Sequence, residues 1–254
     1  MPDSTPSSLE TLPPDVTYVW HGVNDSVNMR HFLGAPVQWG ELDINVDEDG
    51  KQLILRHDSY RDTPHWPGEQ PLKVLDVLPR LLFYGKSVKL DFKVGDSVLE
   101  RVLTWLEQNG VPPIRLWFNA DFDLLGDYWI RQLAGRFPFA VIQVPLNSVL
   151  PRTQLTPAGL TAARPRLQEL RQWGITRWSV GMSYGDVPGL VALLNAWGHE
   201  VNIYGIENLS EFLAVVPLKP TAITADFNFP EWGLFGRGSG HHGHFHAFPA
   251  IPPG

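Results

Sequence analysis

Short runs of apolar residues alternate with longer stretches of helical periodicity along most of the chain. Runs in which side chains alternate between two faces predict strands at Thr17–Asn24, Gly40–Val46, Gln52–His57, Val88–Val94, Ile114–Asp121, Ala140–Leu146, Arg177–Met182, Val201–Ile206 and Ala222–Phe227. Stretches in which apolar residues recur about every 3.6 positions predict helices at Leu72–Leu82, Ser97–Gln108, Tyr128–Phe137, Pro157–Trp173, Val187–Trp197 and Leu209–Val216.

Strands that alternate with helices of this length predict parallel βαβ units, because a parallel connection needs a crossover of a dozen or more residues. Seven or eight such units in one chain favour a closed (β/α)8 barrel of the TIM type, an α/β fold in a single domain. An open doubly wound sheet is the alternative. We expect the barrel over residues 16–235, a polar, disordered N-terminal tail over 1–15 and a Gly/His/Pro-rich tail over 236–254.

The polar residues of the strands fall on one face. In the strand at 40–46, Glu41 and Asp43 share a face and Leu42 and Ile44 share the other. The polar faces downstream carry Lys89, Asp91, Lys93, Trp117, Asn119, Asp121, Asn202, Tyr204, Thr224 and Asp226. Active sites of such barrels lie at the C-terminal strand ends, so these faces are predicted to meet in one pocket. Strands with one solvated face would give the same pattern, but carboxylates inside a barrel are costly unless a cation accompanies them.

Composition excludes several classes of protein. The chain is 43% hydrophobic and 19% charged, which is typical of a folded globular protein. A net charge of −7 argues against a general nucleic-acid binder, and the absence of cysteine excludes disulfides and thiolate metal sites. The start of the chain lacks the basic and apolar segments of a signal peptide, and no apolar run is long enough to span a membrane. We therefore expect a cytoplasmic protein, with its oligomeric state left open.

The residue types that can do chemistry are densest between His21 and Asp58, where the chain reads HGVNDSV and then GELDINVDEDGKQLILRHD. A histidine that ends the first strand, Glu-x-Asp in the second, an acidic Asp-Gly turn and a closing His-Asp pair together resemble the glycerophosphodiester phosphodiesterase-like superfamily. LDFK at Leu90–Lys93 extends this resemblance. HGVN is more similar to the spider-venom phospholipase D branch, whereas RLWFNADF at Arg115–Phe122 and ADFNFPEWG near the end resemble the menorin family. The matches cover most of residues 16–233.

The resemblance implies roles for six residues. It implies one divalent cation, Mg²⁺ or Ca²⁺ with Mn²⁺ as a further candidate, held by Glu41, Asp43 and Asp91, with His21 and His57 as an acid/base pair and Lys93 on a phosphate oxygen. The chemistry is consistent, since carboxylate oxygens suit hard cations and histidines transfer protons near neutral pH. Which histidine is the acid stays open.

Other residues are candidates for contacts with the substrate. They are Asn24, Trp117, Asn119, Asp121 and Tyr204. Asn119 and Asp121 could instead orient the metal ligands or histidines, or form hydrogen bonds in the barrel core. Arg56, Asn202 and Asp226 are further candidates to which no role is assigned. The loop after His57 could shape a lid through Tyr60, Arg61, His65 and Trp66, or it is a Pro-braced surface loop. The tail residues His241, His242, His244 and His246 could bind Zn²⁺, Ni²⁺ or Cu²⁺, although adventitious affinity of a mobile tail explains them as well.

The sequence thus predicts a metal-dependent enzyme that cleaves a small phosphodiester, either a glycerophosphodiester or a lysophospholipid-like substrate. Hydrolysis and attack by a neighbouring substrate hydroxyl, which gives a cyclic phosphate, both stay open. Gly22 and Val23 stand where bacterial glycerophosphodiesterases have an arginine, so the headgroup stays open as well. The alternative is a non-catalytic, menorin-like binding domain that retains the metal site.

Overall fold

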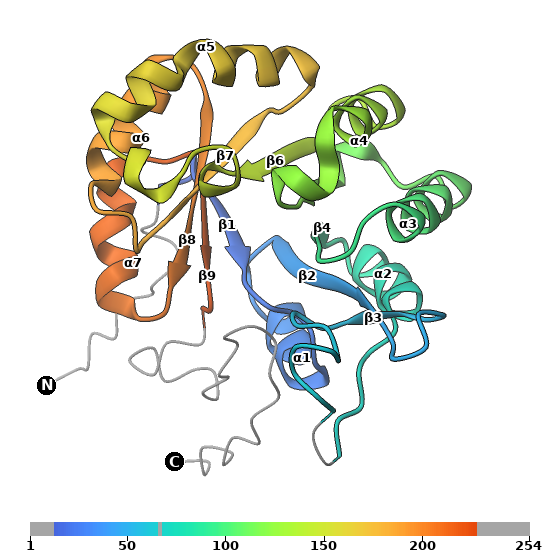
Figure 1. Cartoon of the computed structure of the whole chain (residues 1–254). Helices are drawn as coiled ribbons and strands as arrows, with labels where there is room; N and C mark the ends of the chain where they lie inside the picture. The colour runs from blue at the N-terminus through green and yellow to red at the C-terminus, as the bar shows by residue number, and fades with distance from the viewer. Residues whose placement is uncertain (1–12, 66–67, 228–254) are drawn as a thin grey trace, which may run out of the picture.

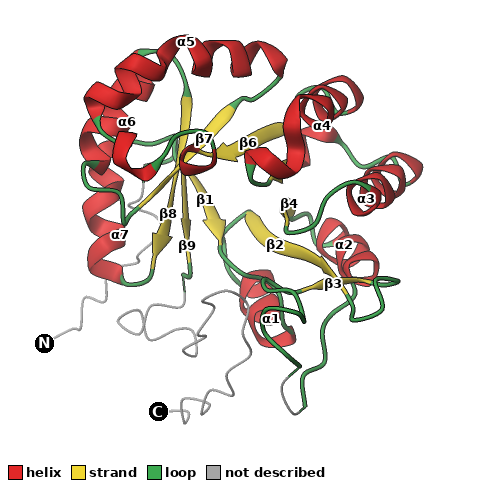
Figure 2. Ribbon diagram, viewed as in Figure 1, coloured by secondary structure: helices red, strands yellow, loops and turns green. Residues whose placement is uncertain are grey.

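The computed structural model describes residues 13–65 and 68–227. Its strands are β1 (Thr17–Trp20), β2 (Trp39–Val46), β3 (Leu53–Leu55), β4 (Ser87–Phe92), β5 (Leu116–Asn119), β6 (Val141–Pro145), β7 (Arg177–Gly181), β8 (Glu200–Ile206) and β9 (Ala222–Ala225). Its α-helices are α1 (Ser26–Gly34), α2 (Val74–Phe83), α3 (Ser97–Gln108), α4 (Phe122–Arg136), α5 (Pro157–Trp173), α6 (Val187–Ala196) and α7 (Leu209–Val215). The strands lie inside and the helices surround them (Figures 1 and 2).

Eight of the strands form a closed parallel barrel. Strands β1, β9, β8, β7, β6, β5, β4 and β2 pair in that order, and pairing of β1 with β2 closes the ring. Val19 is opposite Trp39 across the closing pair, and Thr17 is opposite Ala222 on the other side of β1. The predicted (β/α)8 barrel of the TIM type is confirmed, and the open doubly wound sheet is excluded.

Strand β3 lies outside this ring. It pairs antiparallel with β2, with Ile44 opposite Leu55. The connection is a short turn in which the Asp47 N–H donates to the Gln52 carbonyl over 3.0 Å, and Gly50 takes a φ of +71°. A connection this short permits a hairpin but no parallel crossover, so the strand predicted at 52–57 extends the sheet without joining the barrel.

Two helices differ from the prediction. Helix α1 was not predicted because the apolar residues of its sequence, SVNMRHFLG, span less than two turns, although Asp25 caps its first turn through hydrogen bonds from Val27 and Asn28. Helix α4 begins at Phe122 and not at residue 128, with a kink at Gly126, whose φ is +55°. The N-terminal part of α4 lies before this kink, which breaks the apolar periodicity.

The barrel has an apolar outer layer and a mostly polar interior. Leu42 and Ile44 pack outward under the helices and are fully buried. At the N-terminal end of the strands, a small cluster of Val19, Trp117 and Ala222 fills the interior. The polar inward residues therefore meet above this cluster, towards the C-terminal strand ends.

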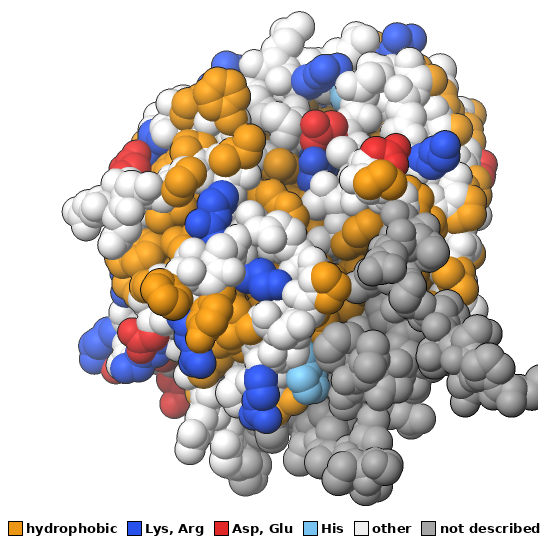
Figure 3. Space-filling model, turned by 180° about the vertical axis from the view of Figure 1, so that it is seen from behind, with side chains coloured by type: hydrophobic (Ala, Val, Ile, Leu, Met, Phe, Trp, Pro, Cys, Tyr) orange, Lys and Arg blue, Asp and Glu red, His pale blue; other side chains and the backbone are white. Residues whose placement is uncertain are grey.

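Several large apolar side chains are exposed at the N-terminal end of the barrel. Phe83, Tyr84, Ile114 and Phe139 lie just before β4, β5 and β6 and are 86%, 56%, 72% and 87% exposed. Figure 3 shows hydrophobic side chains interspersed with Lys and Arg over much of the face turned away from the viewer of Figure 1. Among the described residues, the helices lack the combined length and apolarity needed to cross a bilayer.

Candidate active site

A cavity of about 590 Å³ opens at the C-terminal ends of the barrel strands. Its walls include His21 after β1, Glu41 on β2, His57 after β3 and Asp91 on β4. Strands β6 to β8 and the loops that follow them supply the opposite wall. The cavity therefore brings together residues that lie far apart in the sequence, as the parity of the strands predicted.

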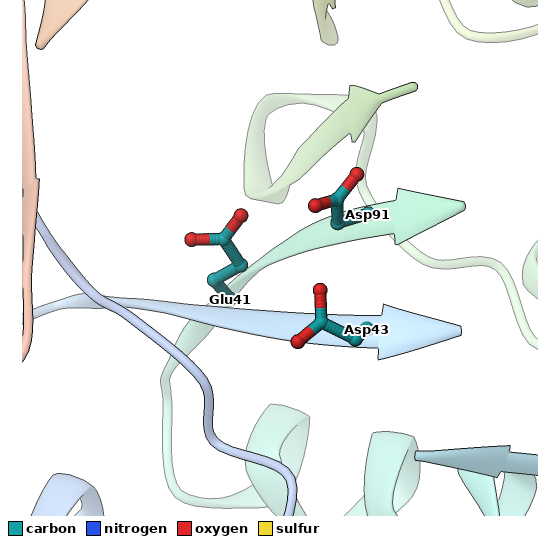
Figure 4. Close-up of side chains that lie close together, drawn as sticks. All are labelled: Glu41, Asp43 and Asp91. Carbon is teal, nitrogen blue, oxygen red and sulfur yellow. The ribbon is translucent and has the colours of Figure 1, made fainter. Parts of the chain in front are cut away.

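Three buried carboxylates lie together at this cavity, and two of them, Glu41 and Asp91, line it while Asp43 lies beside them. Glu41 and Asp43 are two apart on β2, and Asp43 is directly opposite Asp91 on the neighbouring β4. The residues are 4%, 1% and 8% exposed, and one oxygen of each lies within 4.8 Å of the others. Figure 4 shows the three side chains rising from the same side of the two strands.

Two lysines neutralise most of this negative charge. The Lys93 ammonium lies 3.0 Å from Asp43 Oδ1 and 2.7 Å from Asp91 Oδ2, and the Lys89 ammonium lies 3.0 Å from Glu41 Oε1. With all five groups ionised the cluster keeps one net negative charge. Such pairing is what allows carboxylates to be buried at all.

The ionisation of the cluster follows from these pairs. Burial alone would lower the pKa of Lys93, but the charges of Asp43 and Asp91 raise it. Burial would raise the pKa of Asp43, but Lys93 outweighs burial and lowers it. For Asp91, burial outweighs Lys93 and raises the pKa to about 6. Asp43 and Asp91 are thus available as anions at neutral pH.

The cluster fits a hard divalent cation. Glu41 Oε2 is buried and has no hydrogen-bond partner among the described residues, so one oxygen remains unused within the cluster. Carboxylate oxygens converging from two adjacent strands are the donors that Mg²⁺ and Ca²⁺ prefer. Glu41, Asp43 and Asp91 are the residues that would hold such an ion.

Two asparagines fix the orientation of the aspartates. Asn24 donates to Asp43 Oδ2 over 2.5 Å and accepts from the Asp43 N–H over 2.9 Å. Asn119 donates to Asp91 Oδ1 over 2.7 Å and accepts from Gln143 over 2.6 Å. Each asparagine amide thereby limits the rotation of one carboxylate, which is how outer residues commonly orient metal ligands.

His21 stands at the end of β1 beside a carboxylate of β9. Its backbone N–H donates to Ala225, and Gly22 takes a φ of +63°, which allows the chain to turn away directly after the histidine. His21 Nδ1 lies 2.7 Å from Asp226 Oδ1. A carboxylate can only accept, so Nδ1 carries the proton of this hydrogen bond.

Asp226 controls the charge of His21. Burial alone would lower the pKa of His21, but the hydrogen bond and charge of Asp226, with the charges of Glu41 and Asp43, raise it to about 9. The imidazole is therefore protonated at neutral pH. A histidine in this state can donate a proton.

His57 has a carboxylate partner from its own loop. Its Nδ1 lies 2.6 Å from Asp58 Oδ1, and Asp58 Oδ2 accepts from the Thr63 hydroxyl over 2.8 Å. Both cavity histidines thus carry the same arrangement, in which Nδ1 is held by an aspartate.

The opposite wall adds polar groups that the sequence did not single out. The Tyr184 hydroxyl donates to Asn147 and lies 3.1 Å from the Tyr204 hydroxyl. Gln143, Asn147 and Arg152 line the cavity together with the predicted Tyr204. Of these residues, only Gln143 could have been found from the sequence, because it lies on a strand with its side chain inward. Asn147, Arg152 and Tyr184 lie outside the strands.

The predicted residues do not all reach the cavity. Of the candidates for substrate contact, Lys93, Asn119, Asp121 and Tyr204 line it, and Asp121 is exposed at its edge. Asn24 lies behind Asp43, and Trp117 is fully buried in the cluster below the cavity, so neither is brought to its wall. Trp66 and the four tail histidines, His241, His242, His244 and His246, fall outside the described residues.

Comparison with known proteins identifies relatives in fold only. The chain matches no protein-family model and no curated protein. A putative glycerophosphoryl diester phosphodiesterase from Agrobacterium tumefaciens is 17% identical with a TM-score of 0.64 over 83% of this chain and 93% of that chain. A glycerophosphodiester phosphodiesterase from Parabacteroides distasonis is 12% identical, with a TM-score of 0.61 over 86% and 95%.

A third similar structure contains a ligand. It is a phosphodiesterase from Oleispira antarctica in complex with the product sn-glycerol-3-phosphate, 15% identical with a TM-score of 0.59 over 86% of this chain and 94% of that chain. At such identities the likeness establishes a shared barrel fold. The chemistry of the site must be argued from its own residues.

Proposed function

We propose that the chain is a metal-dependent phosphodiester-cleaving enzyme of the glycerophosphodiester phosphodiesterase superfamily. The observation that supports this most directly is a cluster of three buried carboxylates, two of which line the same cavity as two aspartate-held histidines. Carboxylates that can hold a hard cation, beside two groups that can move protons, form a minimal set for cleaving a phosphodiester.

In this proposal the two histidines have different tasks. His21 is protonated at neutral pH because Asp226 raises its pKa to about 9, so it donates a proton from Nε2 to the leaving oxygen. His57, with Nδ1 engaged by Asp58, accepts a proton at Nε2 from the attacking water or substrate hydroxyl. The new P–O bond forms as the old one breaks, and one proton is taken up while one is released.

A cation held by Glu41, Asp43 and Asp91, with Mg²⁺, Ca²⁺ and Mn²⁺ as candidates, would supply charge neutralisation for the phosphodiester. Lys93, which forms ion pairs with Asp43 and Asp91, would contact a phosphate oxygen beside them. The remaining wall, with Asn119, Asp121 and Tyr204, would receive the groups attached to the phosphate.

Turnover of a small set of phosphodiesters tests the proposal. The set is bis(p-nitrophenyl) phosphate, glycerophosphocholine and a lysophospholipid, each with Mg²⁺, Ca²⁺, Mn²⁺ or chelator. We expect metal-dependent turnover that falls about 10²–10⁴-fold in His21→Ala and is lost in Glu41→Gln. The variant Glu200→Gln is the matched control, because Glu200 pairs with Arg177 outside the cavity.

The product decides the mechanism. A linear monoester seen by phosphorus NMR means that water attacks, and a cyclic phosphate means that a substrate hydroxyl attacks. Absence of turnover with every metal and substrate, in protein that binds the metal, would count against the enzyme.

One observation favours a second candidate, a non-catalytic menorin-like binding domain. Lys89 and Lys93 already neutralise the carboxylates, so the cluster is stable as a structural unit. Turnover separates the two: both bind a divalent cation in a manner abolished by Glu41→Gln, but only the enzyme cleaves a phosphodiester when the cation is bound.

A further inference from the structure

A buried arginine lies at the base of the loop that follows His57. The Arg56 side chain is 2% exposed and belongs to the residue directly after β3. Its Nε donates to Glu69 Oε1 over 2.7 Å, and the Glu69 side chain is itself 5% exposed. A buried charged pair of this kind is costly unless each hydrogen-bonding group is used.

The guanidinium uses its other donors on the backbone of the same loop. Nη1 donates to the Asp58 carbonyl, and Nη2 donates to the Thr63 carbonyl over 2.7 Å. The Tyr60 ring covers the guanidinium, with 4.2 Å between the guanidinium carbon and the ring centroid. Arg56 thus joins three separate points of the loop, which a lysine with a single nitrogen could not do.

Two of the groups that Arg56 binds, the backbones of Asp58 and Thr63, belong to the residues that determine where the Asp58 carboxylate lies. Asp58 offers Oδ1 to His57 Nδ1, and its Oδ2 accepts from the Thr63 hydroxyl. Arg56 binds the backbone carbonyls of Asp58 and Thr63, so the distance between them is set by one rigid planar group. The carboxylate that faces His57 is therefore fixed from behind.

We propose that Arg56 is a positioning residue that holds Asp58 against His57, so that His57 keeps its proton on Nδ1 and presents Nε2 to the cavity. Its importance for catalysis rests on the proposed function, but its effect on His57 does not. The segment from Asp58 to Thr63 is then held in a fixed position behind His57.

Nitrogen NMR of His57 tests this, with its signals assigned by their loss in His57→Gln. In the wild type, neutral His57 should show the Nδ1–H form alone. In Arg56→Lys we expect a mixture of both tautomers, together with a fall in kcat/KM on bis(p-nitrophenyl) phosphate of about 10–100-fold, the usual effect of losing an outer residue. Thr63→Val, which removes only the hydroxyl, should shift the tautomers in the same direction by less.

Arg177→Lys provides a matched control. Arg177 is also buried, pairs with Glu200 at 2.7 Å and has its guanidinium carbon 4.2 Å from the Trp117 ring centroid, but it lies at the start of β7. Arg177→Lys should lower the melting temperature as Arg56→Lys does, but it should leave the tautomer of His57 as in the wild type.

Two results separate the inference from the proposed function. If Arg56→Lys and Thr63→Val both leave the tautomer of His57 as in the wild type, the positioning role is refuted, whatever the activity. If the tautomer changes as expected while the wild type cleaves no phosphodiester, the positioning role stands and the proposed function fails.

Discussion

Replacing Asp226 by asparagine removes the charge that keeps His21 protonated. Asp226→Asn keeps the shape of the side chain, but the amide carries no negative charge beside His21 Nδ1. The pKa of His21 should then fall from about 9 towards its ordinary value of 6.5, because the hydrogen bond and charge of Asp226 are the largest of the effects that raise it against burial. The variant is therefore expected to lose the proposed proton donor at neutral pH.

The same change predicts how stability depends on pH. The pKa of His21 is raised on folding from 6.5 to about 9, so protonation favours the folded state. This contribution is complete below pH 6.5 and is lost as the pH rises through 9. A shift of this size corresponds to at most about 3 kcal/mol. The true figure is smaller because the His21 side chain is 21% exposed and solvent screens its pair with Asp226.

Urea unfolding of the wild type and Asp226→Asn at several pH values between 6 and 10, with chelator present, measures this effect. The difference in free energy of unfolding between the two proteins should be largest near pH 6 and should shrink by about 1–3 kcal/mol as the pH approaches 10. Comparing differences removes the other titrating groups. Asp123→Asn, an exposed residue in the first turn of α4, is the control and should show no such trend.

A difference that does not change with pH would refute the assignment of the raised pKa to the His21–Asp226 pair. In activity measurements, the basic limb of the pH profile of kcat/KM should move to lower pH in Asp226→Asn. An unchanged basic limb would mean that His21 is not the proton donor.

Two further substitutions test the barrel, one at its interior and one on its outer face. Lys93→Met removes the ammonium that contacts two carboxylates, so it should lower the free energy of unfolding in chelator by about 3–5 kcal/mol. A saturating divalent cation should reduce the difference in melting temperature between the wild type and this variant. An unchanged difference would argue against a cation at these carboxylates. Gly40→Ala would place a Cβ 2.6 Å from the Phe32 ring and should lower the free energy of unfolding in urea by about 1–3 kcal/mol. In the control Gly34→Ala, the new Cβ meets no atom within 4 Å and should change that free energy by less than about 1 kcal/mol. Equal effects of the two substitutions would contradict the packing of α1 on β2.

The barrel could be predicted because its signals are local. The alternation of Glu41 and Asp43 with Leu42 and Ile44 is a property of a single strand, and it indicates which face lies inside. Helix α1 was missed for the opposite reason, since its apolar residues span less than two turns and only Phe32 and Met29 among them are buried. Tertiary packing of those two residues stabilises the helix, and a pattern search cannot detect it.

The site could be predicted only in part. Its carboxylates lie on strands whose parity indicated convergence, but the partner of His21 is 205 residues away in the sequence. Asp226 was known to lie on a polar face, and only closure of the ring by β1 and β9 brings the two side chains together. The role of Arg56 depends on the fold of a loop, and loop geometry has no period to detect.

The position of β3 at the edge of the sheet determines which part of the site unfolds first. His21 follows β1, which is hydrogen-bonded on both sides, whereas His57 follows a three-residue strand that pairs with β2 and has one further bridge, from Ile54 to Lys73. We expect this hairpin to open at a lower free energy than the ring, with earlier exchange of its amide hydrogens. Mild denaturant would then inactivate the protein while the barrel stays folded. The denaturant concentration at which this happens would depend on the contacts of the Arg56 guanidinium with the loop after β3.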